Sequence, residues 1–162
     1  MFRIGIGEDT HRLAAGRKLI LGGVEIPFEL GLLGHSDADA LAHAVIDALL
    51  GACALGDIGQ HFPDSDEAFR GISSLLLAKE AAARIRAAGF ETVNIDSVIT
   101  AQKPKLAPFR EAMRANLAEA LGVPPENISV KFTTPEGTGP EGNLECITFR
   151  AVAAVRKVRI QC

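Results

Sequence analysis

The chain contains no tryptophan and no tyrosine, so alanine, leucine, isoleucine and valine carry most of its apolar content. Its three cysteines, Cys53, Cys146 and Cys162, lie far apart and form no C-x-x-C pair. This spacing predicts neither a disulfide framework nor a thiolate zinc site, and we expect reduced, unpaired thiols.

Long apolar runs and basic clusters are absent as well. The sequence has no stretch of about 18 apolar residues, and its first residues lack the apolar segment of a signal peptide. The net charge is −3, and no run of lysine and arginine provides a basic face. We therefore expect a cytoplasmic protein with no membrane contact and no nucleic-acid partner.

The length and the apolar content indicate one domain over residues 1–162. Of these residues, 48% are hydrophobic, which is enough to bury a sizeable core. Hydrophobic periodicity predicts an α+β fold, with a mixed β-sheet and helices packed on one face. The expected strands cover residues 2–7, 91–101, 128–132 and 144–160, with a hairpin of 18–21 and 24–26. The expected helices cover 36–52, 74–88 and 108–121, with loops at 31–34, 57–64 and 137–142.

The last strand indicates how the domain assembles. Residues 151–155 read Ala-Val-Ala-Ala-Val and are apolar on both faces of a strand. Both faces must then be buried, yet three helices can cover only one side of a small sheet. We therefore expect a homo-oligomer assembled through its sheets.

A candidate metal site is formed by Asp9, His11 and His43. Asp9 and His11 lie two apart, which places them on one side of an extended segment, and His43 lies within an expected helix. Two imidazoles and one carboxylate suit zinc and leave a fourth position open, as in catalytic sites. The D-x-H pattern also occurs by chance without a metal.

Two aspartates flank His43 at a spacing of four residues. Asp39, three residues after Ser36, resembles part of a helix cap. Asp47 is a candidate for orienting the imidazole of His43, and ordinary solvation of the helix is the alternative.

Further segments carry groups that suit phosphate. His35 and Ser36 precede the first long helix, where free N–H groups favour anions, although Ser36 also suits plain capping. Residues 133–136, Thr-Thr-Pro-Glu, follow a strand and offer two hydroxyls and a carboxylate for a hard cation, or form an ordinary turn. Residues 102–105 add two lysines, which on a surface often serve only solubility.

These motifs occur together in one order. They are Asp9-Thr-His11, His35-Ser-Asp-Ala-Asp39 with His43, Asp57-Ile-Gly59, Phe62-Pro-Asp64, Ala101-Gln-Lys-Pro-Lys105 and Thr133-Thr-Pro-Glu136. In this order the chain resembles the 2-C-methyl-D-erythritol 2,4-cyclodiphosphate synthase family of the non-mevalonate isoprenoid pathway. The resemblance covers residues 2–155.

The resemblance implies two metals and a homotrimer with active sites between subunits. Asp9, His11 and His43 would hold zinc or another divalent transition metal, and Glu136 would bind Mg²⁺ or Mn²⁺. His35 and Thr134 would be catalytic. The substrate contacts implied are Asp9, Thr10, His11, His35, Ser36, Asp57, Ile58, Gly59, Phe62, Pro63, Asp64, Ser65, Asp66, Ala101, Gln102, Lys103, Pro104, Lys105, Leu106, Ala107, Thr133, Thr134, Pro135 and Glu136.

The reaction implied is an intramolecular cyclisation of a cytidine diphosphate substrate. Its 2-phosphate attacks the β-phosphorus of its own cytidine diphosphate arm and CMP leaves, so no protein nucleophile is required. A phosphohydrolase and a non-catalytic trimer are the alternative functions. The chain departs from the family pattern at Pro135, Pro140 and Asn143, so we expect no isoprenoid diphosphate in a central trimer cavity.

Overall fold

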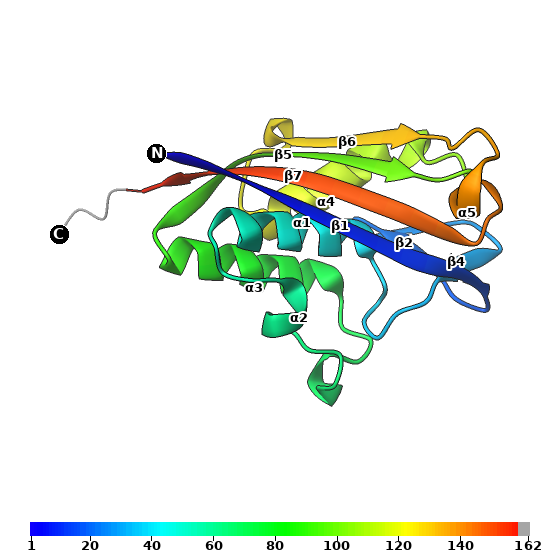
Figure 1. Ribbon diagram of the computed structural model, residues 1–162, viewed down its shortest axis with the longest axis horizontal. Coiled ribbons are helices and arrows are strands. Elements are labelled where there is room, and N and C mark those ends of the chain that lie inside the picture. Colours follow the sequence, from blue (N-terminus) through cyan, green and yellow to red (C-terminus); the bar gives the residue numbers. More distant parts are fainter. Residues whose placement is uncertain (159–162) are drawn as a thin grey trace.

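The computed structural model describes residues 1–158, which form a mixed five-stranded sheet in the order β4-β1-β7-β5-β6 (Figure 1). Only β5 and β6 pair in parallel, and the other neighbours are antiparallel. The strands are β1 (Phe2–Ala15), β4 (Leu30–Leu32), β5 (Phe90–Thr100), β6 (Ile128–Thr133) and β7 (Cys146–Lys157). A separate hairpin joins β2 (Leu19–Leu21) to β3 (Val24–Ile26), as its central Gly22-Gly23 predicts.

Three long helices, α1 (Ala40–Ala52), α3 (Ser74–Ala87) and α4 (Arg110–Leu121), pack on one side of this sheet (Figure 1). Helix α1 contacts β1 and β7 on one side and α3 on the other. It is therefore buried nearly all round, and Leu41, Val45 and Leu49 are fully inaccessible to solvent. The prediction of an α+β fold with helices on one face of a mixed sheet is confirmed.

Two glycines let β1 approach α1 at backbone distance. A Cβ added at Gly5 would lie 2.1 Å from the carbonyl oxygen of Ala48, and one added at Gly7 would lie 2.0 Å from that of Ala44. No side chain fits in this space, so only glycine permits the contact. The close packing fixes α1 against the strand segment that continues to Asp9 and His11.

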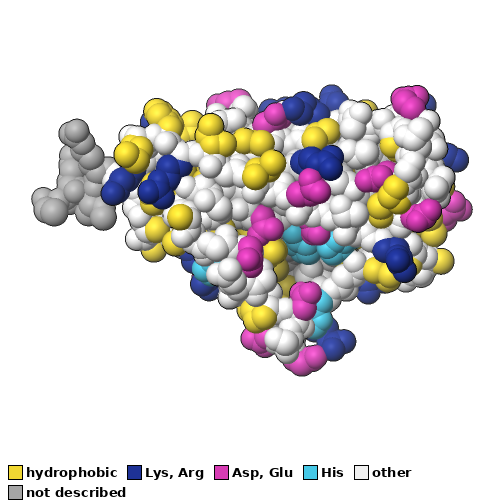
Figure 2. Space-filling model, in the orientation of Figure 1, with side chains coloured by type: hydrophobic (Ala, Val, Ile, Leu, Met, Phe, Trp, Pro, Cys, Tyr) yellow, Lys and Arg dark blue, Asp and Glu magenta, His cyan; other side chains and the backbone are white. Residues whose placement is uncertain are grey.

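The residues of β1 alternate between the two faces of the sheet. Gly5, Gly7, Asp9 and His11 face α1, whereas the even-numbered residues face the opposite side. On that opposite side Phe2, Ile4 and Ile6 are exposed by 67%, 74% and 71%. Val152 of the neighbouring β7 is also exposed, and Figure 2 shows hydrophobic side chains gathered near this end of the sheet. Within residues 1–158 nothing covers this apolar stripe, and the expected trimer stays a prediction.

The structure corrects the predicted boundaries of β1, β4 and β7. Strand β1 extends to Ala15 instead of ending at residue 7, because β7 pairs with it from Phe2↔Arg156 to Arg12↔Cys146. Residues 30–32 form β4 rather than a loop, since they pair with the end of β1. Strand β7 is continuous over Cys146–Lys157, and the part of the predicted strand beyond residue 158 lies outside the described residues.

The first long helix begins at Ala40, four residues later than predicted. Ala38 adopts a left-handed conformation with φ 59°, which cannot continue a helix, and Asp39 caps α1 by accepting a hydrogen bond from Ala42 N–H. Two predicted loops instead contain single helical turns, α2 (Ile58–His61) and α5 (Gly139–Gly142). One turn is too short to show a hydrophobic period in the sequence.

Candidate functional site

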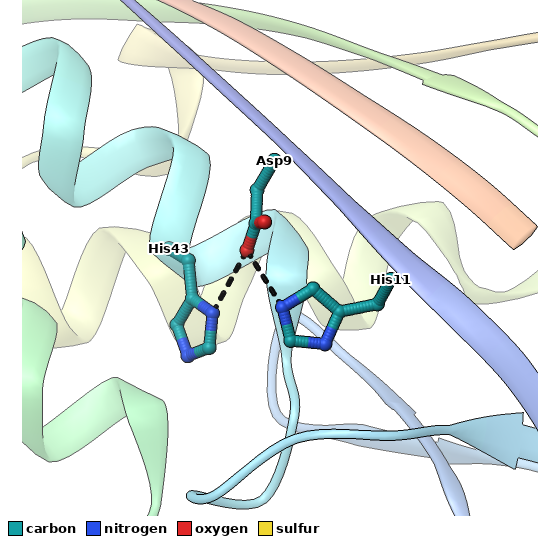
Figure 3. A group of neighbouring side chains, drawn as sticks. All are labelled: Asp9, His11 and His43. Carbon is teal, nitrogen blue, oxygen red and sulfur yellow. Dashed lines mark hydrogen bonds and ion pairs between the residues drawn. The ribbon is translucent and has the colours of Figure 1, made fainter. Parts of the chain in front are cut away.

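Strand β1 and helix α1 bring Asp9, His11 and His43 together (Figure 3). Asp9 Oδ2 lies 3.0 Å from His11 Nε2 and 3.0 Å from His43 Nδ1. One donor atom from each residue lies within 4.8 Å of the other two. The predicted cluster therefore exists, and its donor set of one oxygen and two imidazole nitrogens fits a zinc-type ion.

The protonation of this cluster follows from its burial and its charges. Burial raises the pKa of the Asp9 carboxyl, but hydrogen bonds and positive charge from His11 and His43 outweigh it and hold that pKa well below its usual range. Burial lowers the pKa of His11, yet the hydrogen bond and the charge of Asp9 raise it above the ordinary value. Asp9 is thus an anion over the whole physiological pH range, which suits a cation-binding centre.

The second nitrogen of each histidine has a different environment. Nδ1 of His11 is buried and has no hydrogen-bond partner within residues 1–158. Nε2 of His43 lies 2.9 Å from Ser74 Oγ and 3.2 Å from Ser36 Oγ. Ser74 is a residue that the sequence did not single out, because a serine at the start of a helix reads as an ordinary cap.

The prediction that Asp47 orients His43 is wrong. Asp47 Oδ1 instead accepts a hydrogen bond of 2.7 Å from the N–H of Ile58 and so fixes the start of α2. Burial raises the pKa of the Asp47 carboxyl above its ordinary value. Asp39 acts as the predicted cap and also accepts hydrogen bonds from the N–H groups of Gly22 and Gly23, which attaches the β2–β3 hairpin to α1.

A pocket of about 260 Å³ opens at the cluster of Asp9, His11 and His43, and Figure 2 shows histidine and acidic side chains around this hollow. Its lining is drawn from β1, α1, α2, α3 and the loops before α1 and α3: Glu8, Asp9, His11, Gly34, His35, Ser36, His43, Asp47, Ile58, Gly59, Phe62, Asp64, Phe69 and Leu77. Most of the expected substrate contacts of this half of the chain lie here.

Other predicted contacts from the first half of the chain lie outside this lining. Asp57 caps α2 by accepting from Gln60 N–H, and Asp66 caps the 3₁₀ turn Glu67–Phe69. Thr10 faces the opposite side of the sheet, where its hydroxyl lies 2.9 Å from that of Thr148. Pro63 and Ser65 also lie outside the lining, in the segment between α2 and this 3₁₀ turn.

A second pocket of about 550 Å³ lies where the parallel strands β5 and β6 end. Its lining contains most of the expected nucleotide contacts: Ile99, Ala101, Gln102, Pro104, Lys105, Leu106, Ala107, Pro108, Phe132, Thr133 and Thr134. Lys103 is outside this lining. Among the described residues, the two pockets share no lining residue.

The loop after β6 holds the carboxylate of Glu136 in a defined place. Thr134 Oγ1 donates a hydrogen bond of 2.6 Å to Glu136 Oε1, and Gly137 N–H donates to Gln102 Oε1 at 2.9 Å. Glu136 has φ 53°, a left-handed conformation that is unusual for a residue other than glycine. The loop thus presents an exposed carboxylate and a hydroxyl at the edge of the second pocket.

An acid and two histidines that converge from a strand and a helix of an α+β domain form a candidate metal site. The family can be named more narrowly, because a model of the YgbB family matches residues 2–156. The chain belongs to the YgbB family.

Individual relatives agree with this assignment. The chain is 60% identical over 158 residues to a 2-C-methyl-D-erythritol 2,4-cyclodiphosphate synthase from Carboxydothermus hydrogenoformans, covering 98% of this chain and 97% of that protein. It is 58% identical over 156 residues to the bifunctional enzyme IspD/IspF from Albidiferax ferrireducens, covering 96% of this chain but only 37% of that relative's length. A solved structure of a 2C-methyl-D-erythritol-2,4-cyclodiphosphate synthase in a CDP-bound form superposes with a TM-score of 0.87 at 42% identity, covering 95% of this chain and 100% of the other.

None of the helices in residues 1–158 combines the length and the apolar character that a membrane span requires.

Proposed function

We propose that the Asp9–His11–His43 centre and the pocket at the ends of β5 and β6 together perform the reaction of the cyclodiphosphate synthases. The activity of the chain is the synthesis of 2-C-methyl-D-erythritol 2,4-cyclodiphosphate, a lyase reaction of the non-mevalonate isoprenoid pathway. The identity of 60% over nearly the full length of a curated synthase carries this conclusion.

The substrate of the proposed reaction is 4-diphosphocytidyl-2-C-methyl-D-erythritol 2-phosphate. An oxygen of its 2-phosphate forms a bond to the β-phosphorus, the bond from that phosphorus to the CMP oxygen breaks, and CMP leaves with the electron pair. Because both reacting groups belong to one molecule, the protein has to fold the substrate and balance its charge. Such positioning contributes about 7–11 kcal/mol in favourable intramolecular reactions.

The metal centre suits the phosphate end of this substrate. Asp9, His11 and His43 would hold zinc or another divalent transition metal, whose positive charge polarises a phosphoryl oxygen when it is bound. His35 and Ser36 lie in the same pocket lining and would contact the phosphates. Ile58, Gly59 and Phe62 in that lining, with Asp57, Asp64 and their neighbours, would contact the methylerythritol part.

The second pocket suits the nucleotide. A relative with a CDP-bound structure supports a cytidine diphosphate ligand, and the cavity of about 550 Å³ is of a size that suits a small molecule. Residues 101–107 would surround the base and ribose, with Lys105 close to the phosphates. Thr133, Thr134 and Glu136 would contact the diphosphate, with the Glu136 carboxylate on Mg²⁺ or Mn²⁺.

A homotrimer would unite the two pockets. Within the described residues of one subunit the pockets have no lining residue in common, so a neighbouring subunit is the natural source of the missing half. The apolar stripe of Phe2, Ile4, Ile6 and Val152 offers a surface for that contact.

Replacing His43 with alanine tests the role of the metal centre. We expect His43→Ala to lose bound zinc and turnover while it keeps the oligomeric mass of the parent, because two ligands hold zinc poorly and His43 lies on α1, on the other side of the sheet from the apolar stripe. Metal analysis, light scattering and release of CMP measure these properties. His61→Asn is the matched control, since His61 bonds to Leu55 and Arg84 rather than to the cluster, and it should keep its zinc.

The reaction products separate the proposed activity from hydrolysis. Phosphorus NMR of the parent reaction should show a cyclic diphosphate, whereas a phosphohydrolase would release free phosphate. Full turnover by His43→Ala with zinc absent would refute the metal assignment.

A further inference from the structure

Beyond the three candidate metal ligands, a chain of hydrogen bonds runs from His43 to the start of α3. Ser74 Oγ lies 2.9 Å from His43 Nε2, and Asp37 Oδ1 lies 2.5 Å from the same hydroxyl oxygen. In Figure 3 the Nε2 side of the His43 ring points away from Asp9. The order is therefore Asp37, Ser74, His43 and then the cluster at Nδ1.

The directions of these hydrogen bonds follow from the groups involved. A carboxylate only accepts hydrogen bonds, so the single hydroxyl proton of Ser74 points to Asp37. The same oxygen then has only lone pairs to offer His43, and Nε2 must carry a proton to bond to it. A neutral imidazole with its proton on Nε2 has its free lone pair on Nδ1, which is the nitrogen that faces Asp9.

We infer that Ser74 is a positioning residue for the metal centre: directed by Asp37, its hydroxyl holds His43 in the tautomer whose Nδ1 can bind a metal. The inference rests on the proposed function, because it concerns the same centre. Histidine ligands commonly donate their second N–H to an oxygen that fixes the tautomer and the ring orientation, and losing that oxygen typically weakens metal binding about 10–100-fold.

The location of Ser74 separates this role from ordinary helix capping. Ser73 precedes the first residue of α3, and within the described part of the chain its side chain makes no capping hydrogen bond. The N–H of Ser74 is bonded to the other carboxylate oxygen of Asp37 at 3.0 Å, so Asp37 caps the helix and directs the hydroxyl at once. Ser74 itself is fully buried, and its hydroxyl therefore depends on these protein partners.

Ser36 is the competing hydrogen-bond partner for His43. Its Oγ lies 3.2 Å from His43 Nε2 and already accepts a hydrogen bond from Ala38 N–H. The shorter distance to Ser74 and the carboxylate behind it favour Ser74 as the acceptor.

The test compares zinc affinity among variants of the full chain. Metal-free protein is titrated with zinc in the presence of a chromophoric chelator of known affinity. We expect Ser74→Ala to bind zinc about 10–100-fold more weakly than the parent. Ser73→Ala, the same change one residue earlier, should bind zinc like the parent.

Asp37→Asn provides a second variant if Ser74→Ala fails to fold. The Asp37 carboxylate accepts hydrogen bonds from Ser74 O–H, Ser74 N–H and Asp39 N–H. An amide offers only one acceptor oxygen to these three donors, so the hydroxyl loses its fixed direction. Zinc affinity should fall in this variant as well.

Nitrogen NMR of the zinc-loaded protein adds a signature that a purely structural role would not change. The His43 Nε2–H signal should be visible in the parent and in Ser73→Ala, and it should shift or exchange rapidly in Ser74→Ala. Parental zinc affinity in both Ser74→Ala and Asp37→Asn would overturn the inference. A loss of zinc affinity seen only in Ser36→Ala would also overturn the inference. Failure of the parent to bind zinc at this centre would instead count against the proposed function.

Discussion

Adding one methyl group at Gly7 should separate β1 from α1 and so damage the metal centre from a distance. The Cβ of Gly7→Ala would lie 2.0 Å from the Ala44 carbonyl oxygen and 2.7 Å from the Ala48 nitrogen. Both contacts involve backbone, so no side-chain rotation can relieve them. The strand or the helix has to move.

The size of that movement follows from the contact distance. An ordinary contact requires at least 3.4 Å, so strand and helix must separate locally by about 1.4 Å, several times the tolerance of about 0.2 Å for metal–ligand distances. Asp9 and His11 lie on the strand and His43 on the helix, so the separation acts directly between the ligands. Overpacking typically costs about 1–3 kcal/mol, and we expect the free energy of unfolding to fall by about 3 kcal/mol. Zinc affinity should fall at least about tenfold.

The same substitution at Gly51 of α1 is the matched control. The nearest atom to a Cβ added there is the carbonyl oxygen of Ile6 at 3.9 Å, and position 51 is exposed. Alanine in place of an exposed helical glycine stabilises by about 0.5–1 kcal/mol. The two variants should therefore change stability in opposite directions.

Denaturant unfolding of metal-free protein at one fixed concentration measures the stability change, and zinc titration measures the change at the centre. If Gly7→Ala unfolds at the parental midpoint and binds zinc with parental affinity, the backbone contact between β1 and α1 does not hold the ligands in place, and the reasoning fails.

Three further substitutions test other parts of the site. Glu136→Ala should raise the Mg²⁺ concentration needed for half-maximal turnover by about tenfold or more while zinc content stays constant, because the variant lacks the proposed carboxylate ligand. An unchanged Mg²⁺ titration would contradict the assignment of Glu136 to Mg²⁺. Ala101→Leu should fill the second pocket and weaken CDP binding about tenfold or more, since an overpacked contact costs about 1–3 kcal/mol. Parental CDP affinity measured by calorimetry would count against a nucleotide site there. Burial raises the pKa of Asp39 to about 6 from 3.8. Between about pH 4 and pH 6 the folded chain therefore holds a proton that the unfolded chain has released. The stability that this group contributes falls as the pH rises through that range and then levels off. Asp39→Asn should remove this part of the pH dependence, and identical slopes in the two proteins would show that Asp39 does not titrate in this way.

The candidate metal centre was predictable because the sequence pattern that indicates it is local. The spacing of Asp9 and His11 places both side chains on one face of an extended segment whatever the strand's length, and His43 lies in a strongly apolar-periodic helix. The long helices and the β2–β3 hairpin were predictable for the same reason, since each carries its own pattern. The family motifs added the expectation that these distant segments serve one reaction.

The contacts that complete the centre depend on tertiary structure. Ser74 reaches His43 only because α3 packs against α1, and the sequence around Ser74 carries no sign of that neighbour. Asp47 has a suitable spacing from His43, yet the start of α2 supplies an N–H that binds its carboxylate instead. The left-handed turn at Ala38 likewise has no sequence signal, because alanine is not a residue that favours it.

The alternation along β1 gives this strand an unusually low tolerance for changes in length. Odd-numbered positions from Gly5 to His11 serve the helix contact and the ligands, while Phe2, Ile4 and Ile6 form the apolar stripe on the reverse side. Gaining or losing a single codon within this segment would exchange the two sets, turning carboxylate and imidazole outward and driving isoleucine into the glycine-lined contact. A change in chain length is therefore compatible with the ligands only outside this segment, for example in the loops beyond Ala15.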